Sequence, residues 1–228
     1  MNAEVARARD HTRTGVLLLT IGIAIGWIPY IQDLGGLLIF IGIIFLFIGR
    51  WGFSDRHHDL VVAGGVLLVI AIIGVVIVAF ALATALIQAA TQIGATAQSV
   101  GATLQASIQD TLIATVVFAF ISGLGQLLMV WGLADPTSRL LLVTGFVLAI
   151  TISAVLLAIE LPLLANAIQS ATAGATINTG PINALEGQIQ VYGLLSVVPA
   201  SVTGFAYYRI WRGIDRLPMP EAPRASGY

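Results

Sequence analysis

The chain has 228 residues, of which 58% are hydrophobic and only 9% are charged, and its formal net charge is −1. Soluble domains carry about a quarter charged residues, so this composition excludes an ordinary soluble domain. The balanced charge gives no basic field for nucleic acid, and the absence of cysteine excludes disulfides and thiolate chemistry. All ten basic residues are arginine, which excludes lysine Schiff-base enzymes.

Six segments are apolar enough to cross a bilayer, whose core needs about 20 apolar residues per helix. They lie at 15–31, 34–50, 60–86, 111–133, 139–161 and 191–212, and the first two are short. Residues 1–14 are polar, and no small-residue cleavage site follows the first apolar stretch, so we expect a retained helix and no signal peptide. The predicted fold is all-α and membrane-integral, with six transmembrane helices.

The arginines predict the orientation of these helices. In a six-span arrangement all of them fall on one side, namely Arg7, Arg9, Arg13, Arg50, Arg56, Arg139, Arg209, Arg212, Arg216 and Arg224. By the positive-inside rule, the sequence predicts a multi-pass protein of the cell membrane with both termini in the cytoplasm.

The tryptophans indicate an internal repeat. Trp51, Trp131 and Trp211 follow each other at intervals of 80 residues. Each stands at the end of an even-numbered segment and begins a similar five-residue sequence that ends in aspartate. The odd-numbered segments open alike, on Gly15, Gly65 and Gly145. This pattern predicts three tandem parallel hairpins around a pseudo-threefold axis, with the three tryptophans as interfacial anchors. The hairpins cover 15–55, 60–135 and 139–215, between a cytoplasmic N-terminus (1–14) and a cytoplasmic tail (216–228).

The second and third hairpins carry predicted outer insertions, at about 88–109 and about 163–190. Residues 88–109 contain ten Gln, Ser or Thr and no charge. Pro162 is expected to end or kink the helix before the second insertion. Two interpretations stay open: an outer platform that binds a partner, or two insertions that only pack on each other.

Polar side chains repeat at equal spacing within two of the predicted spans. They are Thr115, Ser122 and Gln126 in one span, and Ser196, Thr203 and Tyr207 in the other. Such stripes could line a path for a small uncharged solute. The alternative is hydrogen bonding between packed helices, which we favour because segment 34–50 offers only apolar residues at the corresponding positions.

The remaining polar groups give no catalytic, cofactor or metal site. Glu160 is expected near the outer surface, in an interfacial or structural role. His57 and His58, with Asp55 and Asp59, form the one cluster of metal-ligand residue types, and we expect them in a solvated loop because adjacent histidines point apart. The sequence shows no phosphate loop and no catalytic triad, so we predict that the protein is not an enzyme.

Three features of the chain carry a resemblance: the charged N-terminal stretch Glu4–Arg13, the glycine-rich hairpin Gly15–Gly49 and the long Ala/Gln/Thr outer segments. In these features the chain resembles an uncharacterised family of archaeal multi-pass membrane proteins, and the resemblance implies no activity. The sequence predicts a scaffold or accessory subunit that works through helix packing, either as a homo-oligomer or with a membrane-protein partner. The alternative is a channel or facilitator for a small uncharged solute.

Overall fold

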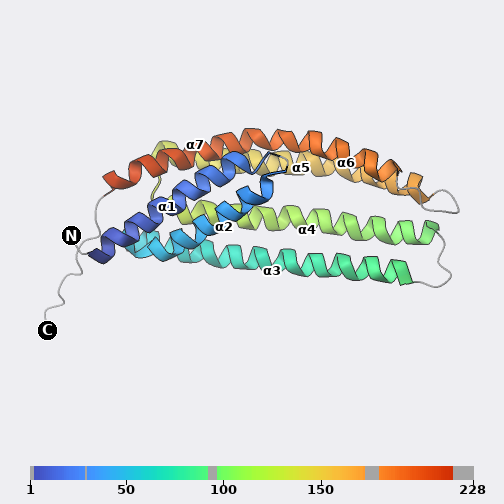
Figure 1. Cartoon of the computed structure of the whole chain (residues 1–228), viewed down its shortest axis with the longest axis horizontal. Coiled ribbons are helices and arrows are strands. Elements are labelled where there is room, and N and C mark those ends of the chain that lie inside the picture. Colours follow the sequence, from blue (N-terminus) through green and yellow to red (C-terminus); the bar gives the residue numbers. More distant parts are fainter. Residues whose placement is uncertain (1–2, 29, 92–96, 173–179, 218–228) are drawn as a thin grey trace. The chain divides into compact units, whose positions relative to one another are not determined.

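The structure, a computed structural model, describes all residues except 1–2, 29, 92–96, 173–179 and 218–228, and every regular element in the described part is helical. The helices are α1 (Ala3–Ile25), α2 (Gln32–Gly49), α3 (Asp55–Thr91), α4 (Ala97–Trp131), α5 (Pro136–Thr172), α6 (Gly180–Gly193) and α7 (Val197–Gly213) (Figure 1). Short 3-10 turns occupy Arg50–Gly52, Leu194–Ser196 and Ile214–Arg216. The prediction of an all-α fold is confirmed. Parts of both predicted insertions, most of the predicted tail and Arg224 lie outside the described residues.

In the described part of the chain, five helical stretches are long and apolar enough to cross a membrane. They are Gln32–Gly52, Asp55–Ala89, Gln98–Trp131, Pro136–Thr172 and Val191–Arg216. The predicted first span, 15–31, is not among them: α1 contains only its residues 15–25, and the first half of that helix is polar. The chain therefore has the helices of a multi-pass membrane protein.

Contacts between residues divide the chain into two compact units. The first contains Met1–Leu68, Gly123–Ala149 and Ser196–Tyr228, and the second contains Val69–Ser122 and Ile150–Leu195. Helices α3, α4 and α5 each contribute residues to both units.

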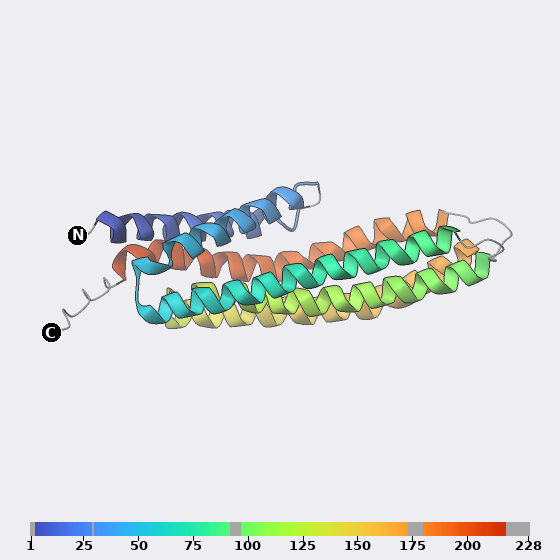
Figure 2. The same cartoon turned by 90° about the horizontal axis from the view of Figure 1, so that it is seen from below.

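In the first unit, α1 packs against both α2 and α7 (Figure 2). Glycines allow α1 and α2 to approach closely: a Cβ added at Gly15 would lie 2.7 Å from the carbonyl oxygen of Gly42. The outer face of α2 stays apolar and exposed, from Leu34 to Ile48. Small residues at a contact let helix backbones come together, which is how helices associate in lipid without a hydrophobic driving force.

Two further helix pairs of the first unit meet at a glycine near the start of an odd-numbered segment. A Cβ at Gly64 of α3 would lie 2.5 Å from the carbonyl oxygen of Gly125 on α4. One at Gly145 of α5 would lie 3.2 Å from the backbone nitrogen of Thr203 on α7. Around these crossings the unit buries a continuous apolar core, whose largest fully buried side chains include Leu19, Leu46, Met129, Tyr207 and Ile214.

The second unit has a core built mostly from small side chains. Its buried residues include Ala71, Ala89, Ala167, Ile168, Ala171 and Leu185. A Cβ at Gly101 of α4 would lie 2.8 Å from the hydroxyl oxygen of Thr172 on α5, so the two predicted insertions touch here.

Two helix boundaries differ from those predicted. Helix α1 begins at Ala3 and includes most of the stretch that we expected to be a polar N-terminus. Its first turns are rich in alanine and arginine, which are strong helix formers. Helix α5 does not end near Pro162 but continues to Thr172. Leucines and alanines follow this proline, and their helix propensity is high enough for the helix to continue past one missing backbone hydrogen bond.

Candidate functional site

One end of the first unit gathers arginines around aromatic rings. Each of the three repeated tryptophans has a guanidinium carbon close to its ring centroid: Arg50 lies 5.1 Å from Trp51, Arg139 lies 5.3 Å from Trp131, and Arg13 lies 5.4 Å from Trp211. These distances are within the cation–π range of about 6 Å. Trp51 is exposed, and Trp131 and Trp211 are half-buried.

Arg9 connects three segments of the chain at this end of the unit. Its guanidinium donates to the carbonyl oxygen of Gly52 (3.3 Å) and to that of Leu217 (2.6 Å). Arg13 forms an ion pair with Asp215 at 3.3 Å. The start of α1, the turn between α2 and α3, and the residues after α7 therefore meet at the same end.

Asp135 fixes the turn between α4 and α5 at this end. Its carboxylate accepts a hydrogen bond from the backbone N–H of Ser138 (2.7 Å), which caps α5, and it pairs with Arg209 at 3.0 Å. The hydrogen bonds from Ser138, and then the interaction with Arg209, lower the pKa of Asp135 below its ordinary value.

Residues 55–59, predicted to form a solvated loop, are instead the start of α3, and His57 is not solvated. Its side chain is fully buried at the start of α3, with its ring edge-on to Phe53 at 5.2 Å and with Gly132 packed against it. Neither ring nitrogen has a hydrogen-bond partner in the described part of the chain. His58 instead stacks on Trp51 at 3.8 Å. The solvated-loop prediction failed for His57 because the missing side chain of Gly132 leaves room for the imidazole ring.

The six residues of the predicted solute path do not share one environment. Thr115 is exposed on α4, and its hydroxyl donates to the carbonyl oxygen of Thr111 in its own helix (2.8 Å). Ser122 is half-buried on α4, and Ser196 is half-buried in the 3-10 turn before α7.

The other three path residues line one small cavity of the first unit. Gln126, Thr203 and Tyr207 meet around a volume of about 150 Å³, and the rest of its lining is apolar or glycine. The structure therefore brings together half of the predicted path.

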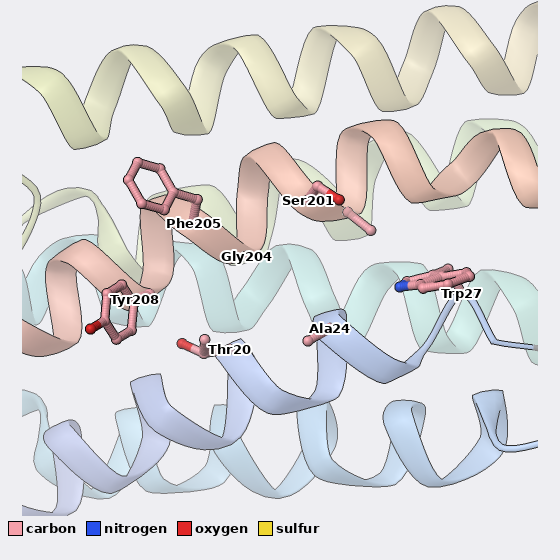
Figure 3. A pocket seen from close by; sticks show the side chains of 8 residues that line it. Thr20, Ala24, Trp27, Ser201, Gly204, Phe205 and Tyr208 are labelled. Atoms are coloured by element: carbon pink, nitrogen blue, oxygen red, sulfur yellow. The ribbon is translucent and has the colours of Figure 1, made fainter.

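A larger opening lies between α1 and α7, where the sequence analysis predicted no site. This opening, which we call the α1–α7 groove, has a volume of about 380 Å³. It is lined by Thr20, Ala24, Trp27, Ala200, Ser201, Gly204, Phe205 and Tyr208. Figure 3 shows Thr20 and Tyr208 facing the space from opposite helices, with Trp27 at the far end. The hydroxyl of Thr20 donates to the Val16 carbonyl oxygen (2.8 Å), so the groove is largely apolar.

A second pocket, of about 430 Å³, shares Phe205 and Tyr208 with this groove. Its other lining residues are Asp135, Arg209, Arg212, Gly213 and Arg216, and we call it the arginine pocket. The signal for both sites was available in the sequence but was not recognised. Trp27 is the one tryptophan outside the repeat, and Tyr208, Arg212 and Arg216 follow each other at steps of four, on one helix face.

Chemically, this end of the unit can bind negative charge and can sit at a membrane–water boundary. Arginines and tryptophans are the residues that hold a helix bundle at that boundary. Among the described residues, no group of three or more His, Asp or Glu side chains could hold a metal ion. No model of a known family matches the chain, and neither the curated proteins nor the solved structures contain a significant match.

Proposed function

We propose that the protein is a non-enzymatic scaffold or accessory subunit of the cell membrane, with six spans and both termini in the cytoplasm. The proposal takes the second half of α1 together with its turn, 15–31, as the first span. The outer parts of α3, α4 and α5 then form the surface that contacts a partner.

The observation that carries this proposal is where large exposed apolar side chains stop along the helices. On α3 the last of them is Ile87, and on α4 the first is Ile113. On α5 the last is Ile159, and among the residues whose side chains the structure describes the next is Val191 on α6. Between these positions the described residues remain helical but expose mainly small or polar side chains.

The helix lengths agree with an extension beyond the bilayer. At 1.5 Å per residue, the 35 to 37 residues of α3, α4 and α5 span about 52 to 56 Å. The hydrocarbon core is about 30 Å thick. The contact between Gly101 and Thr172 joins the outer segments to each other. The outer segments carry almost no charged side chains that could repel a neighbouring protein. This composition favours their use as a contact surface.

The first test is the native mass of the protein extracted gently from its own membrane. We expect a stoichiometric second protein, or a defined homo-oligomer, in the isolated complex. A monomeric protein under these conditions would contradict the scaffold proposal.

A shortened variant tests the outer surface itself. Replacing residues 88–107 by a short turn should remove the partner while leaving the spans inserted. The matched control is Gly36→Ala, which should keep the full complex because a Cβ added at Gly36 would meet no neighbouring atom within 4 Å. Unchanged assembly of a shortened and correctly inserted chain would rule out the platform.

A facilitator for a small uncharged solute is the second candidate. The observation in its favour is the cavity that Gln126, Thr203 and Tyr207 line. Replacing Thr203 by valine keeps the side chain's shape and removes a hydroxyl. Solute flux into liposomes should fall in this variant if the cavity is part of a path, whereas a scaffold would show no flux with either chain.

A further inference from the structure

We infer that the α1–α7 groove and the arginine pocket together bind one anionic phospholipid. An acyl chain would lie in the groove, and the phosphate would lie between Arg212 and Arg216. This inference is independent of whether the protein acts as a scaffold.

The two openings have the complementary chemistry of an amphiphile. The groove is lined mostly by Ala, Gly and aromatic side chains, and the arginine pocket by three arginines and one aspartate. Because both are lined by Phe205 and Tyr208, a single ligand can occupy the two. Each volume also falls within the range of about 300–1,000 Å³ that is typical of ligand sites.

The charges of the arginine pocket are only partly balanced. Asp135 pairs with Arg209 at 3.0 Å. In the described part of the chain, Arg212 and Arg216 form no ion pair, and the Arg212 guanidinium lies 5.9 Å from the Tyr208 ring centroid. Two exposed arginines, one at the end of α7 and one in the 3-10 turn that follows it, are suited to a phosphate, to which arginine can donate two parallel hydrogen bonds.

The depth of the groove fits one leaflet. Arg212 and Ala200 are twelve residues apart in the helical part of the chain, which corresponds to about 18 Å along the axis. Half of the hydrocarbon core is about 15 Å. A chain attached to a phosphate at Arg212 therefore reaches the end of the groove near the middle of the bilayer.

The groove is open enough for a lipid, and charge disfavours a second copy there. Ala24, Ser201 and Tyr208 are exposed, so the site opens to the surface of the unit. In a two-fold pair of chains with the same membrane orientation, this face would meet itself and place the two arginine pockets together. Like charges opposed at an interface are unfavourable. A bound anionic lipid instead balances the positive charge of the arginine pocket.

Quenching of tryptophan fluorescence by brominated acyl chains tests the site directly, because Trp27 lies in the groove. The purified full chain is reconstituted in vesicles of brominated phosphatidylcholine, in which brominated phosphatidylglycerol replaces a rising fraction. The difference between the wild-type chain and Trp27→Phe isolates the signal from Trp27. We expect phosphatidylglycerol to be preferred at the groove by roughly thirtyfold, from about fivefold for each arginine.

Three variants separate the two parts of the site. The double substitution Arg212→Gln with Arg216→Gln should abolish the preference for phosphatidylglycerol. Arg56→Gln, an exposed arginine outside the pocket, should keep it. Ser201→Phe, at an exposed position on the groove lining, should reduce quenching by both lipids.

Three results would overturn the inference. One is equal quenching by the two lipids in the wild-type chain. A second is an anionic preference that survives the double arginine substitution. Protection of Trp27 from both lipids in a complex of higher mass would also overturn it, because a protein would then occupy the groove.

Discussion

At the scale of single residues, His57 is buried among groups that give it no hydrogen bond. The imidazole contacts the Phe53 ring and the backbone at Gly132, and both of its nitrogens lack partners among the described residues. A buried polar atom without a partner costs about 1–3 kcal/mol. The contacts of the His57 ring therefore stabilise the fold, whereas the burial of its two ring nitrogens without hydrogen bonds destabilises it.

Replacing His57 by leucine separates these two contributions. We expect the free energy of unfolding of His57→Leu to equal or exceed that of the wild-type chain by about 1 kcal/mol, because two unpartnered nitrogens disappear. His57→Ala should lose about 2 kcal/mol through the cavity that it leaves. Thermal unfolding in detergent measures both variants. If leucine destabilises as much as alanine, the ring nitrogens have a polar partner in the folded protein.

Asp135 gives a pH dependence of known sign. Its carboxylate has a pKa below the unfolded value because Ser138 donates to it and Arg209 pairs with it. The stabilisation is therefore complete above the ordinary aspartate pKa of about 3.9, and it is lost as the pH falls through the lower, folded-state pKa. Asp135→Ala should cost about 1 kcal/mol at neutral pH through the lost helix cap.

Asp135→Asn is the matched control for this prediction. Asparagine can still cap α5, and an exposed ion pair contributes about 0–1 kcal/mol at most. Its unfolding temperature should stay near that of the wild-type chain at pH 7. Below pH 4 the gap between the wild-type chain and Asp135→Ala should close. A gap that stays constant down to pH 2 would contradict the role of this carboxylate.

At the scale of helices, the glycine crossings determine which helices pair. A Cβ at Gly15 would meet the Gly42 carbonyl oxygen at 2.7 Å and the Leu46 nitrogen at 2.9 Å, which are both backbone atoms that cannot rotate away. Gly15→Ala should therefore destabilise the α1–α2 pair by about 1–3 kcal/mol, the usual cost of overpacking. A Cβ added at Gly36 would meet no neighbouring atom within 4 Å. Gly36→Ala should therefore leave the stability unchanged or raise it by about 0.5–1 kcal/mol through its higher helix propensity. Equal unfolding temperatures for the two variants would argue against a close crossing at Gly15.

The helices, and the glycines near the start of the odd-numbered segments, could be predicted from composition and spacing. The residues that these glycines contact on the neighbouring helix could not. The sequence singled out Gly15 and Gly145, and at the middle position it singled out Gly65, whereas the neighbouring Gly64 makes the close contact. The partner residues are Gly42, Gly125 and Thr203, and they lie nine, six and eight residues before their tryptophans. This register depends on side-chain volumes on both helices at each crossing, and a repeat alignment does not contain that information.

The candidate sites were harder to predict than the helices. Equal spacing placed Thr115 in the same stripe as Gln126, yet Thr115 is exposed and satisfied within its own helix. The α1–α7 groove depends on which faces of two distant segments meet, and on the small residues Ala24, Ala200 and Gly204 between them. Helical periodicity gives a face for each helix, but it does not say which helix lies opposite.

At the scale of the whole molecule, the lack of cysteine makes the topology easy to test. Tyr30, in the turn between α1 and α2, is 93% exposed, and Arg56 at the start of α3 is also exposed. In the six-span arrangement, Tyr30→Cys should react with an impermeant maleimide added to intact cells, and Arg56→Cys should react only after permeabilisation. Labelling of both cysteines from the same side would mean that α2 does not cross the membrane.

The exposed apolar stretches of α2 and α3 have different lengths. From Leu34 to Ile48 the distance along the axis is about 21 Å, and from Val62 to Ile87 it is about 38 Å. A bilayer of uniform thickness cannot match both, and each ångström of mismatch costs a fraction of a kcal/mol. Lipid beside α2 therefore has to thin, or α3 has to tilt. Membrane thickness thus becomes a variable to which the stability and distribution of this protein should respond, even where lipid chemistry is unchanged.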